Sequence, residues 1–387
     1  MYVYDEEIEM KDNRRKLMWM EAFSSIGEAV IGIFLPFLIG RAFGLSMVEV
    51  ILLMSIMQLG LVVSVYPINR LVRALSTQKV ISIGMALYSL FFIVLAIAPE
   101  SRILVAMAAA FYVLSIVFYW PSWHVAFLHS SKDGQRGTFL GNLQMIFVGV
   151  NLVAPLLAGF FLDRGWDLGV LVISVTMFLF AILSLRNVEL PRQKLSKFSK
   201  QWSVFRDDLW KTKHGLGIIT EGIQGGTLWF LWPIFLGAAL GSFTQMGFVV
   251  ALAAIAELVS SKFFGKFTDQ RSARKVLNLG QWFRSLDIGF RGLLMFFPSL
   301  FVASAVTVSA GFLGPIFNIS FYSRTCEIAE KSAPRELEWF IAREWVLGTV
   351  RFIWMMIAAV AVYFWGEMVL GWFLIAAAVA SVGFRRY

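Results

Sequence analysis

Long apolar segments recur along the whole chain and constrain its fold more than any other feature. A helix needs about 20 mostly apolar residues to cross the hydrocarbon core of a bilayer, and twelve such segments are present. They lie at about 17–40, 46–69, 79–98, 102–128, 138–162, 166–185, 215–239, 243–267, 276–297, 299–325, 337–363 and 367–384. Only 15% of the residues are charged, whereas a soluble domain has about 25%. The sequence therefore predicts an all-α membrane protein with twelve transmembrane helices.

The two halves of the chain carry similar sequence around prolines at matching places. Pro36 and Pro233, 197 positions apart, each open a short apolar run that ends in glycine, and Pro121 is followed 194 positions later by Pro315. Internal repeats in strongly apolar sequence are typical of secondary transporters whose site lies between the repeats. We therefore expect two pseudo-symmetric six-helix bundles. The expected division is a cytoplasmic tail at 1–16, a bundle at 17–186, a basic linker at 187–213 and a second bundle at 214–387.

Lysine and arginine are distributed unevenly between the two ends of the expected helices. The side with both termini, the linker and alternate loops holds 27 of them, whereas the other side holds only Arg41, Arg102 and Arg164. Cytoplasmic loops carry this excess in membrane proteins. We therefore expect a multi-pass protein of the cell (inner) membrane with both termini in the cytoplasm. The net charge of +9 is explained by this bias and by attraction to the anionic headgroups of the lipid bilayer. It does not indicate nucleic-acid binding.

A short polar run between the eighth and ninth segments has a distinctive pattern. Gly265 is followed four residues later by Asp269 and then by the basic pair Arg274 and Lys275. This run resembles the cytoplasmic signature of the major facilitator superfamily (MFS). The resemblance implies an MFS-like fold, no cofactor and a monomer. It also implies a cytoplasmic latch that closes and opens as the halves move, and Arg343 and Glu344, near the same end of their segment, are expected partners in it.

Two further features of the sequence bear on the mechanism, one a departure from the family pattern and one a resemblance to it. In the first-half copy of the signature, Arg73 stands about where the family has its acid, which suggests that the second copy carries more of the gating. The run from Ala154 to Gly159, which contains Pro155, resembles the Gly-Pro motif of proton-driven exporters, although small residues also let helices pack closely in lipid.

Three charged residues lie near the middle of expected membrane segments. They are Glu28, Glu257 and Arg351. A charge at the bilayer centre costs at least about 2.5 kcal/mol, so such residues usually face the interior. We expect Glu28 first and Glu257 second as the acid that binds and releases a proton. Arg351 is expected to pair with one of these acids or to bind an anionic group of the substrate, and a permanent ion pair that only fixes the helices is the alternative.

The ninth segment and the fourth segment carry further polar residues. Arg284, Asp287 and Arg291 share one helix face, which predicts a structural salt-bridge ladder. His124 follows Pro121 and is a third candidate for proton coupling, although a single histidine more often has a structural role. The candidates for lining a substrate cavity, besides Arg351, are Trp120, Trp123, Trp229, Trp232 and Asn318.

These features favour a secondary active transporter that works by alternating access. The expected cargo is a hydrophobic or amphipathic small molecule, exported in exchange for protons. Proton symport or facilitated uptake of a small metabolite stays open, as does a non-transporting membrane sensor or assembly factor. We expect no enzyme activity, since no catalytic constellation, metal-ligand spacing or phosphate-binding loop is present in the sequence.

Overall fold

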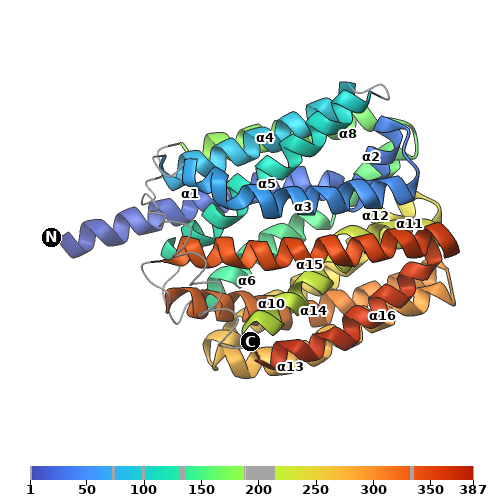
Figure 1. Cartoon of the computed structure of the whole chain (residues 1–387). Coiled ribbons are helices and arrows are strands. Elements are labelled where there is room, and N and C mark those ends of the chain that lie inside the picture. Colours follow the sequence, from blue (N-terminus) through green and yellow to red (C-terminus); the bar gives the residue numbers. More distant parts are fainter. Residues whose placement is uncertain are drawn as a thin grey trace.

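The computed structural model describes residues 2–71, 75–97, 101–130, 136–186, 188, 214–331 and 335–386, and every regular element in these ranges is helical. The expected linker 187–213 lies outside the described residues, apart from residue 188. Eleven helical stretches are long and apolar enough to cross a membrane. The chain is therefore an all-helical, multi-pass membrane protein. The helices run side by side as one elongated bundle (Figure 1).

The described residues of the first half contain nine helical elements. They are α1 (Tyr2–Ile31), η1 (Gly32–Phe34), α2 (Leu35–Phe43), α3 (Met47–Leu71), α4 (Thr77–Ile97), α5 (Arg102–Ser130), α6 (Arg136–Asn151), α7 (Ala154–Leu162) and, as the last of the half, α8 (Asp167–Ser184). Because α1 begins at Tyr2, the expected tail continues the first helix, which projects beyond the bundle (Figure 1).

The second half is also built from helical elements. It contains α10 (His214–Gly225), η4 (Gly226–Leu231), α11 (Trp232–Leu240), α12 (Phe243–Asp269), α13 (Ala273–Gly292), η5 (Leu293–Met295), α14 (Leu300–Glu330), α15 (Glu336–Trp365), η6 (Glu367–Val369), α16 (Leu370–Ala380) and η7 (Ser381–Arg386).

The proline-centred repeats adopt matching local structures. The first helix of each half is interrupted just before its proline, by the 3-10 turn η1 before Pro36 and by the π-helical turn η4 before Pro233. Both helices then end at a left-handed glycine, Gly44 with φ 65° and Gly241 with φ 69°, a conformation that costs glycine little. Pro121 and Pro315 lie inside the long helices α5 and α14. The sequence repeat therefore corresponds to a structural repeat at these positions.

The helix α13 is the exception among the expected spans. It covers most of the expected segment 276–297 but is not among the eleven stretches that qualify by composition. The reason is its charge, since it carries Arg274, Lys275, Arg284, Asp287 and Arg291. It packs along α14 and α16 within the second half.

The halves meet mainly along two surfaces. The helix α3 packs along α15, and α6 and α7 pack along α12. Small residues allow this close approach, because a Cβ atom placed on Gly159 would clash with the backbone of Phe243, and one placed on Gly247 would clash with the backbone of Pro155. We call the end of the bundle where α1 begins and η7 finishes the terminal end, and the end where α2 and α11 finish the opposite end.

Candidate functional site

Among the described residues, the buried acids and bases are Glu338, Arg343 and Glu344 of α15, Asp287 of α13 and His124 of α5. Toward the terminal end, Arg343 of α15 pairs with Glu221 of α10 and, at 3.0 Å, with its neighbour Glu344. The Arg343 and Glu344 side chains are almost fully buried. Ionised groups are stable in such surroundings only when they are paired, so these three residues form an ion-pair cluster within the second half.

His124 connects this cluster to the first half. Its Nε2 atom lies 3.4 Å from Nη1 of Arg343, and its ring stacks on Phe340 of α15 with centroids 4.8 Å apart. Because an arginine only donates hydrogen bonds, this arrangement suits a neutral His124 whose Nε2 accepts. His124 is therefore a contact between the halves.

The aromatic candidates of α5 lie beside another acid. The Trp123 indole donates a hydrogen bond of 3.3 Å to Glu21 of α1, and the Trp120 ring lies 5.8 Å from that of Trp123 and 5.7 Å from that of His124. Trp120, Trp123, His124 and Glu21 therefore form one aromatic and acidic group on the first-half side of the interior.

The second pair of aromatic candidates lies elsewhere. Trp229, in the π-helical turn, is 61% exposed, and Trp232 is buried. The guanidinium of Arg291 lies 4.9 Å from the Trp232 ring. The structure therefore does not bring Trp229 and Trp232 together with Trp120 and Trp123. Asn318 is half-buried on α14.

Glu28 and Arg351 lie near the middle of the membrane-spanning stretches Arg14–Phe43 and Glu336–Trp365. Neither forms an ion pair or a hydrogen bond with any of the residues that the structure describes, and the Nε atom of Arg351 is buried. The expected pairing of Arg351 with Glu28 or Glu257 is therefore not found in this conformation. The Arg351 guanidinium instead lies against α10, where a Cβ atom on Gly225 would be 3.0 Å from its Nη2 atom.

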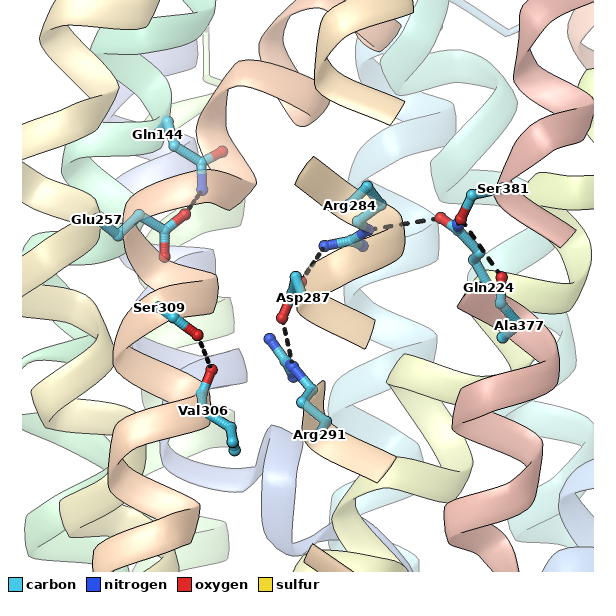
Figure 2. A network of polar contacts seen from close by, with 10 residues as sticks. All are labelled: Gln144, Gln224, Glu257, Arg284, Asp287, Arg291, Val306, Ser309, Ala377 and Ser381. Carbon is cyan, nitrogen blue, oxygen red and sulfur yellow. Dashed lines mark hydrogen bonds and ion pairs between the residues drawn. The ribbon is translucent and has the colours of Figure 1, made fainter. Parts of the chain in front are cut away.

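Glu257 belongs to a different group of polar residues (Figure 2). Its carboxylate accepts a 2.6 Å hydrogen bond from Gln144 of α6, across the boundary between the halves. On α13, Asp287 pairs with Arg284 at 3.4 Å and with Arg291 at 2.9 Å. This confirms the predicted salt-bridge ladder. Arg284 also contacts Gln224 of α10, so the ladder ties α13 to its own half.

The opposite end is joined by a carboxylate that the sequence did not single out. Asp163, directly after α7, accepts hydrogen bonds of 2.9 Å from the backbone N–H groups of Phe243 and Thr244 and from the Ser242 hydroxyl, and one of 2.6 Å from the Thr244 hydroxyl. Partial burial alone would raise the pKa of Asp163, but these four hydrogen bonds outweigh it and lower the pKa below its usual value. Arg41 of α2 covers the Phe243 ring at 4.5 Å.

The residues of the signature run lie at the terminal end. Gly265 is buried in α12 and approaches Gly141 of α6, where an added Cβ atom would be 3.4 Å from the Gly265 Cα. Arg274 and Lys275 are exposed at the start of α13. The side chain of Asp269 lies outside the described residues, so its part in the predicted latch stays a prediction. Within the described ranges, no three His, Cys, Asp or Glu side chains are grouped so that they could hold a metal ion.

Three solved structures with a similar architecture are transporters by name. A bacterial homologue of the iron transporter ferroportin, in its outward-facing state, has a TM-score of 0.67 and 15% identity over 96% of this chain and 98% of its own. The human organic anion transporter MFSD10 (TETRAN) gives 0.70 and 10% over 97% and 99%. A POT family transporter in complex with 5-aminolevulinic acid gives 0.69 and 12% over 96% and 94%. At these identities the likeness concerns the fold.

The fold and the polar interior between its halves define a membrane transporter. The family model of the Major Facilitator Superfamily matches residues 17–220, and the chain belongs to that superfamily. Among curated protein sequences, none matches the chain.

Several residues of the site had no signal in the sequence. Asp163, Gln144 and Tyr112, which lies near Glu28 and Arg351, were not expected. Asp163 and Gln144 make contacts between helices far apart in the chain. An acid directly after a span and a Ser-Phe-Thr helix start are visible in the sequence, but nothing in their spacing shows that they meet.

Proposed function

We propose that this protein is a secondary active transporter that exports an amphipathic small molecule in exchange for protons by alternating access. The observation that carries the proposal is the pair of contacts between the halves. His124 meets Arg343 at the terminal end, and Asp163 meets the start of α12 at the opposite end. Both contacts are polar and reversible, so each can open while the other stays closed.

Glu28 is the proposed proton-coupling acid. It lies at mid-depth between the halves and has neither a cation nor a hydrogen-bond donor as partner among the described residues. An acid of this kind can exchange a proton with whichever side has access. Glu257 is the second candidate, because its hydrogen bond to Gln144 crosses the boundary between the halves and must change when they move.

The proposal includes a specific membrane arrangement. We propose that α13 crosses the bilayer as a twelfth helix, giving two six-helix bundles in a monomer of the cell (inner) membrane. The ladder supports this, since Asp287 is fully buried and neutralises two arginines within the second half. The excess of Lys and Arg at the terminal end supports placing both termini in the cytoplasm.

The test is pH-gradient-driven flux in everted membrane vesicles, with lipophilic and amphipathic solutes as probes. Glu28→Gln should abolish the gradient-driven flux and leave equilibrium exchange of the solute. Glu49→Gln is the matched control, because Glu49 is exposed in the first turn of α3, at the opposite end of the bundle. Unchanged gradient-driven flux in Glu28→Gln would show that Glu28 is not the proton-coupling acid. Absence of flux for every solute that binds would favour a sensor.

A further inference from the structure

Glu28 and Arg351 lie at the same depth on opposite halves of the protein. The membrane-spanning stretches Arg14–Phe43 and Glu336–Trp365 are both 30 residues long. Glu28 is the fifteenth residue of the first and Arg351 the sixteenth of the second. Both stretches begin at the terminal end, so the two charges lie at the same depth in the bundle.

Among the described residues, neither of these two groups is within ion-pair or hydrogen-bond distance of the other or of any further side chain. An uncompensated charge in such a place costs several kcal/mol. The other acids nearby, Glu21 and Glu221, differ, because Trp123 and Arg343 bind them. Glu28 and Arg351 are therefore able to form ion pairs with a bound solute.

Tyr112 of α5 lies within electrostatic range of both charges. Tyr88 and Tyr119 lie within the same range of Glu28, and the Tyr88 and Tyr112 rings pack with their centroids 6.0 Å apart. The first-half side of this region is therefore aromatic and can contact an apolar or aromatic body.

The α10 side of this space is shaped around Arg351. Gly225 leaves room for the guanidinium, and Gly226 leaves room for Trp354, whose Cδ1 would lie 3.2 Å from an added Cβ atom. The Trp354 indole is fixed by a 2.8 Å hydrogen bond to Thr227, in the π-helical turn that starts at Gly226. Such turns occur frequently at functional sites.

We propose that the substrate is a dipolar molecule whose cationic group binds Glu28 and whose anionic group binds Arg351, with an apolar body against the tyrosines. This rests on the proposed transport function and names its substrate class. A dipolar solute compensates both charges, whereas a singly charged solute leaves the other charge unpaired. We therefore expect the protein to prefer solutes that carry both charges on one molecule.

Four small probes test the proposal by calorimetric binding to the protein in lipid nanodiscs without any gradient. Phenylalanine carries both charges on adjoining atoms, and 3-[4-(aminomethyl)phenyl]propanoate carries them at opposite ends of its ring. Phenylethylamine has only the cation and 3-phenylpropanoate only the anion. At least one dipolar probe should bind roughly tenfold to hundredfold more tightly than both singly charged probes, the difference expected for one more charged hydrogen bond.

Variants assign each charge. Glu28→Gln should lose the advantage of the dipolar probe over the anion, and Arg351→Gln should lose its advantage over the cation. Arg351→Lys should retain part of the preference. Glu49→Gln and Arg102→Gln, at exposed positions of the opposite end, should bind as the unaltered protein does, and the elution profile of each variant in size-exclusion chromatography shows whether it is folded.

The outcomes separate this proposal from the transport function. Equal or weaker binding of both dipolar probes, or no binding of any probe, overturns the proposed substrate class. A preference that survives in both Glu28→Gln and Arg351→Gln overturns the site. Gradient-driven flux of singly charged solutes without any dipolar preference leaves the function standing without this site, whereas dipolar binding without flux leaves the site standing without the function.

Discussion

At the scale of single residues, the charges in this protein fall into two groups that have different consequences. Arg343, Glu221 and Asp287 are held by partners and stabilise one conformation. Glu28 and Arg351 have no such partner among the described residues, and we propose that they bind a proton and a solute. Asp163 belongs to the first group but bridges the halves, so its contact also reports which end is closed.

The contact of Asp163 with the start of α12 should depend on pH at its own end of the protein. Its pKa is lowered by the four hydrogen bonds, so the contact is fully formed above the ordinary Asp pKa of about 4 and is lost as the pH falls through the lowered value. The distance between spin labels at Ser46 and Trp365, both exposed at this end, should stay constant from about pH 8 to pH 5 and lengthen only in stronger acid.

Asp163→Asn should open the same end at neutral pH. Loss of a helix N-cap contact costs about 0.5–2 kcal/mol, which shifts the equilibrium between closed and open by a few-fold to about thirtyfold. Arg102→Gln serves as a control, since Arg102 is exposed at the same end of the bundle. An unchanged label distance in Asp163→Asn would show that the contact does not hold this end closed.

At the scale of helices, α13 is held by its ion-pair ladder as well as by apolar packing of residues such as Leu277 and Ile288. Asp287→Asn should leave Arg284 and Arg291 without compensation in the interior, and breaking a buried pair in this way costs about 3–5 kcal/mol. The measurement is thermal unfolding in detergent. Glu327→Gln removes an ion pair from a partly exposed site on α14 and should cost no more than about 1 kcal/mol. Equal losses in the two variants would contradict the structural role of the ladder.

The glycine contact between α7 and α12 gives a second prediction at this scale. Gly159→Ala would force the helices apart, because its new methyl group clashes with the Phe243 backbone. Gly149→Ala is the matched control in α6, where nothing lies within 4 Å. The first variant should increase the labelling of a cysteine placed at the opposite end of the boundary, in a Cys326→Ser background, and the second should not. Equal labelling would contradict the role of this contact.

The parts of this architecture that the sequence predicts are local or repeated. The ladder follows from positions three and four apart on α13, and the matching breaks before Pro36 and Pro233 follow from the repeat. Contacts such as Glu257 with Gln144 or Glu221 with Arg343 join helices distant in the chain, and no spacing encodes them. The composition of α13 also shows why hydropathy alone finds eleven spans.

At the scale of the whole molecule, polar contacts join the two halves at both ends, with Glu28 and Arg351 between them. Alternating access requires that one set of contacts opens while the other holds. The halves meet along α3 with α15 and along α6 and α7 with α12, and these pairs are the surfaces about which they can rock.

The most direct test is therefore a pair of spin-label distances recorded in the same protein with Cys326 replaced by serine. One pair, Ser46 with Trp365, reports the opposite end, and the other, Lys79 with Arg274, reports the terminal end, all four positions being exposed. Across changes of pH and added dipolar solute, one distance should shorten whenever the other lengthens. Two distances that stay fixed, or that lengthen together, would contradict transport by alternating access.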